Sequence, residues 1–305
     1  MSQIVFFGTE DFSLSTLKAL VHSQYDIAAV VTKPDSRQGR GQKLTPPAVK
    51  VFAEQHNIAV WQPVKLIDVT ENIKSLKSPA GVLVSYGKII PQSIIDLFTP
   101  GIINIHPSLL PRYRGPSPVE SAIVNGDLVS GVSIMQLSAS MDAGPVYAQR
   151  ILDLDGNEEV SQLYNTLAQV GIELLLTNLP SILSGTMHPT AQNETLATYC
   201  QLIKKSDGVV QWGQSAEMIE RKIRAYRTWP KTRTIIGASE VIITSAHIEP
   251  EVTGTPGSIS ICDEIAGILS INTGNGSLVI DNIQPVGKKE MPIKAFLSGY
   301  KSQLI

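Results

Sequence analysis

Short apolar segments alternate with longer amphipathic ones through the first half of the chain. The apolar segments lie at residues 4–7, 27–32, 59–61, 81–85 and 101–105, and helix-favouring segments lie at 13–21, 47–56 and 92–98. Short apolar runs bounded by turn residues predict buried strands, and a 3.6-residue periodicity predicts helices. Asp11 or Ser13 is expected to cap the first helix. The alternation, with right-handed crossovers, predicts an α/β fold with a doubly wound, mostly parallel sheet.

The pattern changes in the second third of the chain. A short helix at 119–124 precedes strands at 132–137 and 146–152, which a turn at 141–145 connects. This arrangement predicts a hairpin-like edge added to the sheet. A long amphipathic helix at 159–184 then closes the first domain.

A polar segment at 190–206 separates this part from a region with a different pattern. That region begins with a helix at 215–226, and short strands follow at 232–236, 240–247, 256–261, 266–272 and 277–283. Closely spaced short strands of this kind predict a small β-barrel. The chain is therefore expected to have two domains, at 1–189 and 207–305, joined by a linker at 190–206.

Composition is typical of a globular protein in a reducing compartment. The chain has 305 residues and 43% hydrophobic composition, enough for two cores. The start lacks the basic and long apolar regions of a signal peptide, and no apolar run approaches the ~18 residues that cross a bilayer. Cys200 and Cys262 lie far apart and supply no metal-ligand cluster. We therefore expect a cytoplasmic protein with no membrane partner and no metal.

Basic residues are unevenly distributed, although the net charge of −2 gives no sign of a nucleic-acid partner for the chain as a whole. One basic group surrounds Asp35 and comprises Lys33, Arg37, Arg40 and Lys43. The other is interleaved with Tyr226 and Trp229 and comprises Arg221, Lys222, Arg224, Arg227, Lys231 and Arg233. A single basic run usually forms a solvated face, but two runs in different halves of a slightly acidic chain favour contacts with phosphates.

The segment 103–116 carries the strongest chemical signal. Asn104 and His106 are two residues apart in an apolar strand, so their side chains point to the same side. Pro107 ends the strand and places His106 at a carboxyl end, where open parallel sheets bind their ligands. If Asp142 lies in a neighbouring loop, the site holds an amide, an imidazole and a carboxylate.

These three side chains suit acyl transfer better than metal binding. Negative charge that develops on the oxygen of an attacked amide could be stabilised by Asn104 and His106. Asp142 could orient the imidazole and help to remove a proton from an attacking amine. The residues alone leave two alternatives open, because His106 also suits a hydrogen-bonded core position and Asp142 also suits a turn.

Several longer motifs accompany these residues. The run N-x-H-P-S-L-L-P-x-x-x-G begins at Asn104, and M-D-A-G-P occupies 141–145. The start of the chain carries F-x-G-T-x-D-F, residues 30–44 carry V-x-T-K-P-D-x-x-x-G-R-G-x-K-L, and residues 85–91 are S-Y-G-K-I-I-P. The second domain carries I-R-A-Y-x-x-W-P at 223–230 and Q-P-x-G-K-K-x-M at 284–291. Over nearly the whole chain this set resembles the 10-formyltetrahydrofolate-dependent formyltransferases, and within them the branch that acts on initiator tRNA.

The resemblance implies a Rossmann-like catalytic domain and an OB-like second domain. It also implies that Asn104, His106 and Asp142 are the catalytic residues. The folate-binding residues that it implies are Tyr86, Gly87, Ser108, Leu109, Leu110 and Pro111. The tRNA-binding residues that it implies are Lys33, Arg37, Arg40, Lys43, Arg221, Arg224, Arg227, Lys288 and Lys289.

The function that follows from the resemblance is one-carbon transfer in translation initiation. The formyl group would pass from 10-formyltetrahydrofolate to the α-amino group of methionyl initiator tRNA, without a metal. The expected partners are folate and the initiator Met-tRNA, and a monomer suffices for this chemistry.

Two other classes of function remain as alternatives. A sugar-amine formyltransferase or a formyltetrahydrofolate hydrolase would keep Asn104, His106 and Asp142 but would need neither basic group. A non-catalytic RNA-binding module would need the second domain but not the three polar residues. The presence of both features favours the tRNA enzyme.

Overall fold

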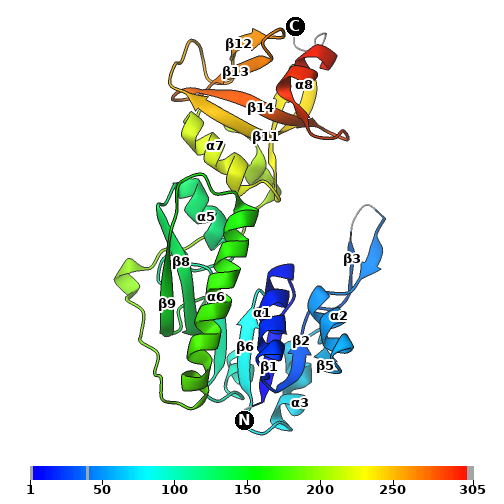
Figure 1. The fold of residues 1–305 in the computed structure, drawn as a ribbon, viewed down its shortest axis with the longest axis vertical. Coiled ribbons are helices and arrows are strands. Elements are labelled where there is room, and N and C mark those ends of the chain that lie inside the picture. Colours follow the sequence, from blue (N-terminus) through cyan, green and yellow to red (C-terminus); the bar gives the residue numbers. More distant parts are fainter. Residues whose placement is uncertain (1–2, 39–40, 301–305) are drawn as a thin grey trace. The chain divides into compact units, whose positions relative to one another are not determined.

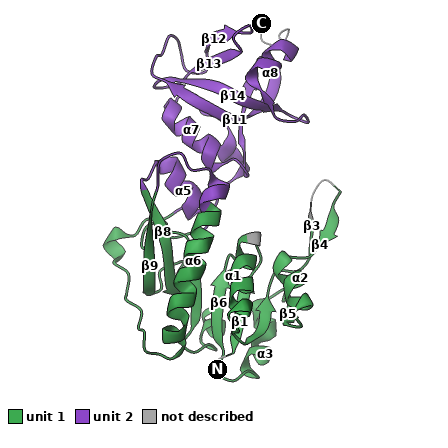
Figure 2. Ribbon diagram, viewed as in Figure 1, with its two compact units in different colours: residues 1–115, 129–153, 164–199 green, residues 116–128, 154–163, 200–305 purple. Residues whose placement is uncertain are grey.

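The computed structural model describes residues 3–38 and 41–300, which form two compact units (Figure 2). Unit 1 comprises residues 1–115, 129–153 and 164–199. Unit 2 comprises residues 116–128, 154–163 and 200–305. The chain passes between the units several times, so each unit is assembled from segments that are distant in the sequence.

Unit 1 is built on a seven-stranded sheet (Figure 1). Its strands in spatial order are β5 (Ala59–Trp61), β2 (Ile27–Val31), β1 (Ile4–Gly8), β6 (Ala80–Val84), β7 (Ile102–His106), β8 (Val129–Gln136) and β9 (Val146–Asp153). The first five are parallel, whereas β8 is antiparallel to β7 and β9 is antiparallel to β8. The structure therefore confirms the doubly wound, mostly parallel sheet with a hairpin at its edge.

Helices pack on the sheet of unit 1. They are α1 (Asp11–His22), α2 (Ala48–Gln55), α3 (Thr70–Lys74), α4 (Gln92–Ile95) and the greater part of α6 (Val160–Leu183). One core cluster joins Val5 and Phe7 of β1 and Ile102 of β7 to Ile73 of α3 and Ile94 of α4. These contacts bury one face of the sheet beside the strand that ends in the predicted site.

Helix α6 approaches strand β7 closely. A Cβ at Gly171 would lie 2.8 Å from Cγ2 of Ile105, so this approach requires glycine. Ile105 alternates with Asn104 and His106 along the strand, and the two polar side chains therefore point away from α6. By length and composition alone, α6 is the one helix of residues 3–38 and 41–300 that could cross a membrane. Its apolar residues are partly buried in the protein core.

Unit 2 contains an antiparallel sheet and helices. The strands in spatial order are β10 (Thr232–Ile236), β11 (Ser239–Glu249), β14 (Ser277–Pro285), β13 (Ile268–Asn272) and β12 (Ile259–Asp263), and β15 (Met291–Pro292) pairs with β14. The helices are α5 (Pro118–Asn125), α7 (Ala216–Ala225) and α8 (Ile293–Tyr300). The core cluster joins Ile219 and Ile223 of α7 to Val241 and Leu269 of the sheet and Phe296 of α8. The predicted domain of short strands around one core is thus present.

Most predicted elements are found within a few residues of their expected bounds, and the differences have local causes. The expected cap of α1 is wrong, because Glu10 is the N-cap residue and the Ser13 hydroxyl donates to its carbonyl oxygen at 2.6 Å. Helix α4 is shorter than the predicted 92–98. The hairpin of β3 (Ser36–Gln38) and β4 (Lys43–Thr45), the short helix α3 and strand β15 were not predicted. Elements this short carry too little periodicity to be recognised.

Candidate active site

The predicted catalytic strand lies inside the sheet. β7 pairs with β6 on one side and with β8 on the other, where Asn104 is opposite Met135 and His106 is opposite Ser133. Asn104 and His106 are each only 5% exposed. Among the described residues, the Asn104 side-chain amide has no hydrogen-bond partner. A nearly buried amide at a strand's carboxyl end is thereby left available for a ligand.

The loop after β7 is held by a buried hydrogen-bond network. The Ser133 hydroxyl donates to the carbonyl oxygen of Ser108 at 2.6 Å and accepts from the amide of Leu110 at 3.0 Å. The Gln149 side chain donates to Leu110 O at 2.9 Å and to the Ser133 hydroxyl at 2.8 Å. The Ser108 hydroxyl donates to Arg112 O at 2.6 Å. The two hairpin strands thus fix the path of the loop that follows His106.

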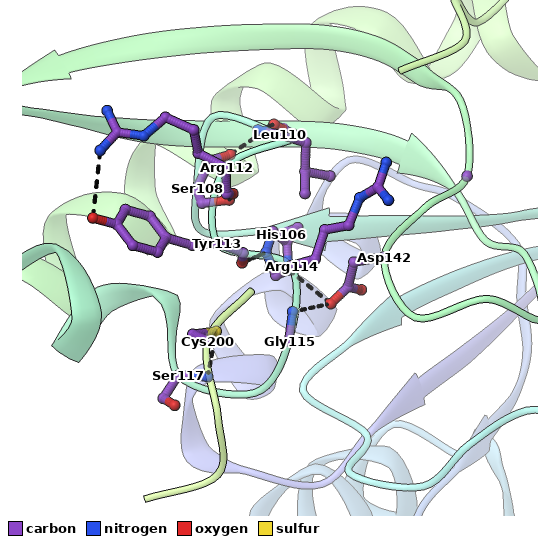
Figure 3. A network of polar contacts seen from close by, with 12 residues as sticks. His106, Ser108, Leu110, Arg112, Tyr113, Arg114, Gly115, Ser117, Asp142 and Cys200 are labelled. Atoms are coloured by element: carbon purple, nitrogen blue, oxygen red, sulfur yellow. Dashed lines mark hydrogen bonds and ion pairs between the residues drawn. The ribbon is translucent and has the colours of Figure 1, made fainter. Parts of the chain in front are cut away.

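His106 is oriented by a backbone carbonyl. Its Nε2 lies 2.9 Å from Tyr113 O. A carbonyl oxygen can only accept, so this contact assigns the hydrogen to Nε2 and leaves Nδ1 for chemistry. Nδ1 faces Asp142 Oδ2 at 3.7 Å, which is an ion-pair distance but too long for a hydrogen bond (Figure 3). The hydrogen bond that orients the ring therefore comes from the loop, and a role of Asp142 in orienting the ring stays a prediction.

Asp142 occupies a tight turn between β8 and β9. Its backbone has φ +47°, in the left-handed region that non-glycine residues seldom adopt. Its Oδ2 accepts a 2.8 Å hydrogen bond from the amide of Gly115. Gly144 is needed in the same turn, because a Cβ there would lie 1.9 Å from Gln136 O. The turn therefore places the Asp142 carboxylate beside His106, although the two residues are 36 positions apart in the sequence.

This arrangement supplies the groups that amide-forming transfer requires. A nearly buried amide and an imidazole share one face of a strand, and a carboxylate lies beside the imidazole. An amide N–H and a protonated Nδ1 can both donate to an oxygen that becomes negative. Within residues 3–38 and 41–300, no group of three or more His, Cys, Asp and Glu side chains is arranged to hold a metal.

The predicted folate loops follow neighbouring strands. Ser108, Leu109, Leu110 and Pro111 follow β7, and Tyr86 and Gly87 follow β6. Among them Ser108, Leu110 and Tyr86 are buried. The loops therefore border the same carboxyl edge of the sheet, as a ligand crevice requires.

Tyr86 contributes its backbone rather than its ring to this edge. Its side chain is 1% exposed and lies edge-on to Phe7, 5.8 Å between ring centroids. Burial raises the pKa of Tyr86 to about 12. Its carbonyl oxygen accepts from the Thr9 hydroxyl at 3.1 Å. The ring is thus part of the core, and folate binding by Tyr86 stays a prediction.

Lys33 lies beside the predicted folate loop. Gly87 has φ +71°, and a Cβ there would lie 2.3 Å from Lys33 Nζ. The ammonium is also 3.9 Å from Glu10 Oε1. Lys33 was assigned to the tRNA group, and its position at the carboxyl ends of β1, β2 and β6 places a positive charge at the edge where the reaction is expected.

Two members of the first basic group lie on the hairpin of β3 and β4. Arg37 and Lys43 are exposed on its two strands. Arg40 lies outside the described residues. The base of the hairpin is held by Asp35, which lies 2.9 Å from Lys50 Nζ and accepts from Gln62 at 2.7 Å. Hydrogen bonds from Gln62 and Lys50 lower the pKa of Asp35.

Three arginines of the second basic group have acidic partners within unit 2. Arg224 lies 2.6 Å from Glu220 and donates to Glu158 O at 2.9 Å. Arg227 lies 3.1 Å from Glu290, and Arg221 lies 3.8 Å from Glu217.

Lys288 and Lys289 differ from these arginines. Both are exposed between β14 and β15 and form no ion pair with a described residue.

A separate hollow of about 240 Å³ in unit 2, lined in part by Glu120, Gln201 and Tyr226, contains none of the predicted site residues.

Comparison with known proteins agrees with these features. The formyl transferase model matches residues 2–179, and the model of the formyl transferase C-terminal domain matches residues 202–301. The chain belongs to the formyl transferase family. The methionyl-tRNA formyltransferase of Chloroflexus aurantiacus is 39% identical over 300 residues, which cover 97% of this chain and 96% of the relative. That of Sulfurihydrogenibium is 39% identical over 303 residues, with 98% and 97% covered.

Solved structures of other family members show the same fold. The N-formyltransferase from Helicobacter canadensis, solved with folinic acid and dTDP-3-aminofucose, has a TM-score of 0.70 at 19% identity and covers 93% of this chain and 100% of its own. HypX from Aquifex aeolicus, in complex with tetrahydrofolic acid, has a TM-score of 0.65 at 21% identity, with 97% and 47% covered. These likenesses support the formyltransferase fold in a chain whose sequence relatives act on tRNA.

Several residues of the site were not singled out in the sequence. Tyr113 O orients His106, Ser133 and Gln149 hold the loop, and Gln192 contacts the Asp142 turn. Tyr113 lay within the family motif at a position where the motif specifies no residue. The others lie in unremarkable polar contexts, and no local pattern marks them.

Proposed function

We infer that the protein transfers a formyl group from 10-formyltetrahydrofolate to the α-amino group of methionyl-tRNA. The observation that carries this inference is the relationship to methionyl-tRNA formyltransferases at 39% identity, which spans both family segments rather than the catalytic segment alone. The arrangement of Asn104, His106 and Asp142 at the carboxyl edge of the sheet supports the same chemistry.

In this proposal Asn104 and His106 stabilise the transition state. The free amine attacks the formyl carbon on N10, and a carbon–nitrogen bond forms while the carbonyl oxygen becomes negative. The Asn104 amide and the protonated Nδ1 of His106 donate to that oxygen. Loss of one such donor typically costs ~2.7–4 kcal/mol of barrier. The unpartnered amide of Asn104 and the fixed ring of His106 support these roles.

Asp142 handles the proton in the same proposal. The attacking nitrogen must lose one proton, and N10 must gain one when its bond to the formyl carbon breaks. A carboxylate 3.7 Å from Nδ1 of His106 lies close enough to the reacting groups to accept that proton, directly or through water. The proton released by the amine then balances the proton taken up by N10.

The finer assignments belong to this proposal as well. We propose that Gly87, the main chain of Tyr86, and Ser108, Leu109, Leu110 and Pro111 border the folate. Arg37, Arg40 and Lys43 of the first basic group meet the acceptor end of the tRNA, and Lys33 faces the reacting end. Lys288 and Lys289 contact tRNA phosphates directly. The arginines of the second basic group bind a phosphate only after they release the glutamates that they contact in the free protein; they are Arg221, Arg224 and Arg227.

The proposal also covers the acceptor tRNA, the compartment, the oligomeric state and the domain bounds. The tRNA is the initiator, the enzyme acts as a cytoplasmic monomer without a membrane partner, and the domains are 1–189 and 207–305 with a linker at 190–206. The unit boundary at residue 199 and the C-terminal family segment starting at 202 lie near the end of that linker.

The test is the transfer of labelled formyl from 10-formyltetrahydrofolate to purified initiator Met-tRNA. Uncharged tRNA, an elongator Met-tRNA, a free amino sugar and buffer serve as parallel acceptors. Label on the initiator Met-tRNA is the expected result. Label on the amino sugar, or folate turnover with buffer alone, would replace the proposal with the sugar-amine transferase or the hydrolase. Absence of any turnover would favour the non-catalytic RNA-binding alternative.

A further inference from the structure

Gln192 bridges the two ends of the Asp142 turn. Its side-chain nitrogen donates to Asp142 O at 2.8 Å and to Gly144 O at 2.7 Å. Asp142 has the uncommon φ of +47°. Such a backbone conformation persists only when surrounding contacts hold it. Gln192 supplies two of these contacts from a segment 50 residues further along the chain.

The other end of the Gln192 amide is fixed by Arg114. Its Oε1 accepts from Arg114 Nη2 at 2.8 Å and from Nε at 3.0 Å. Both hydrogens of the amide nitrogen and both lone pairs of the amide oxygen are therefore used, which assigns the orientation of the amide without ambiguity. The amide acts as a rigid spacer between a guanidinium and a turn.

Arg114 is itself tightly held. Its side chain is 1% exposed, and Nη1 and Nη2 donate to the two carboxylate oxygens of Glu194 at 2.9 and 2.7 Å. The Tyr199 hydroxyl lies 3.2 Å from Nη1. The backbone amide of Arg114 donates to Thr198 O at 2.9 Å. Paired, bidentate contacts of this kind fix a guanidinium in position as well as in charge.

The position of Arg114 connects this clamp to both catalytic candidates. Its neighbour Tyr113 supplies the carbonyl oxygen that orients His106. Its other neighbour Gly115 supplies the amide that binds Asp142 Oδ2. Residues 113–115 therefore hold the two side chains, while Gln192 holds the backbone of Asp142. Figure 3 shows this loop, with the Asp142 carboxylate facing His106 and Gly115.

We propose that Gln192 is a positioning residue for the formyl transfer, holding the Asp142 turn at the distance from His106 that the reaction requires. The inference rests on the proposed function and deepens it, because it assigns an active-site role to the segment before residue 200, which the sequence marked only as linker. In this proposal Gln192 touches no reacting atom. It acts on the rate through the place of the Asp142 carboxylate.

Two variants distinguish a positioning role of Gln192 from a purely structural role, in which Gln192 only attaches its segment to Arg114. Gln192→Glu keeps an acceptor for Arg114 but replaces the donor with a carboxylate oxygen that faces two carbonyl oxygens. Gln192→Ala removes both ends of the bridge. Asn193→Ala is the matched control, since among residues 3–38 and 41–300 the Asn193 side chain bonds locally, accepting from the amide and hydroxyl of Thr195 at 3.1 and 2.7 Å.

Steady-state kinetics of formyl transfer to initiator Met-tRNA are measured for each purified full-length protein, together with its thermal unfolding. Displacement of a catalytic group by about 1 Å can lower the rate about 100-fold, so kcat should fall by about 10- to 100-fold in Gln192→Glu and Gln192→Ala. KM for both substrates should stay within about twofold of wild type, because the proposal gives Gln192 no contact with either substrate. Asn193→Ala should keep the wild-type kcat.

The outcomes are distinguishable. A wild-type kcat in a folded Gln192→Glu protein would overturn the proposal, and so would a higher KM with unchanged kcat. If Gln192→Ala does not fold, Gln192→Glu decides, because it retains the contact with Arg114. Absence of transfer by the wild-type protein would instead contradict the proposed function, so the two failures cannot be confused.

Discussion

The carboxyl edge of unit 1 and the basic stretch of unit 2 use charged residues in opposite ways. At the edge, Arg114, His106 and Asp142 are buried or nearly so and are held by several directed hydrogen bonds. In unit 2, Arg221, Arg224 and Arg227 are paired with glutamates on or near the surface. A buried, oriented group carries large individual effects, whereas solvent screens surface charges and their effects are small and additive.

The largest expected effect comes from His106→Ala. Loss of a charged donor to the developing oxyanion should lower kcat about 10³-fold. The protein should remain folded, because the ring lies at the end of its strand and one hydrogen bond to Tyr113 O is lost. Activity is measured by single-turnover transfer and folding by circular dichroism. Loss of folding together with activity would instead indicate a structural histidine.

A smaller effect is expected from the hairpin in unit 1. Arg37→Gln and Lys43→Gln should each weaken Met-tRNA binding by about fivefold at low salt, since a phosphate contact carries a slope of roughly 0.7 in log affinity against log salt. KM for 10-formyltetrahydrofolate should not change. Lys77→Gln, an exposed lysine outside both basic groups, is the charge-matched control. Equal losses for both substrates would remove the hairpin from the tRNA interface.

Basic residues of unit 2 with and without an acidic partner should differ in their effects on stability and on tRNA binding. Arg224→Gln should lower the free energy of unfolding by about 1 kcal/mol, because it loses the ion pair with Glu220 and the hydrogen bond to Glu158 O. Lys289→Gln should leave stability unchanged and reduce the salt slope of tRNA binding by roughly 0.7–0.9. Urea titration and binding at several salt concentrations measure both. The reverse pattern would assign the phosphate contact to Arg224.

The smallest effect is the pH dependence of the Arg114 clamp. Hydrogen bonds from Arg114 lower the pKa of Glu194 below its ordinary value of 4.5. A carboxyl group with a lowered pKa in the folded state stabilises the protein fully above its unfolded pKa, and this contribution is lost as the pH falls through the folded value. The stability difference between wild type and Glu194→Gln should therefore shrink as the pH is lowered below about 4.5, by urea titration. A difference that is constant with pH would show that the clamp does not depend on this charge. The effect is small because the Glu194 side chain is 67% exposed.

Much of unit 1 followed from local patterns. The strands around residues 4–7, 27–32 and 101–105 are marked by short apolar runs, and the structure places them in one parallel sheet as predicted. The functional prediction depended more on the motifs than on periodicity. The hairpin of β3 and β4 escaped detection because two three-residue strands with a single apolar residue, Leu44, show no recognisable alternation.

The sequence by itself determined where strand β7 ends and which polar residues that end carries. Proline after His106, and apolar residues on either side of Asn104, decide both locally. Only the tertiary structure decided which atoms of these residues are free to react. The contacts of His106 with Asp142 and of Asp142 with Gln192 join residues 36 and 50 positions apart. Because hydrogen-bond geometry depends on distances of a few tenths of an ångström, the packing of distant segments, and no local pattern, sets it.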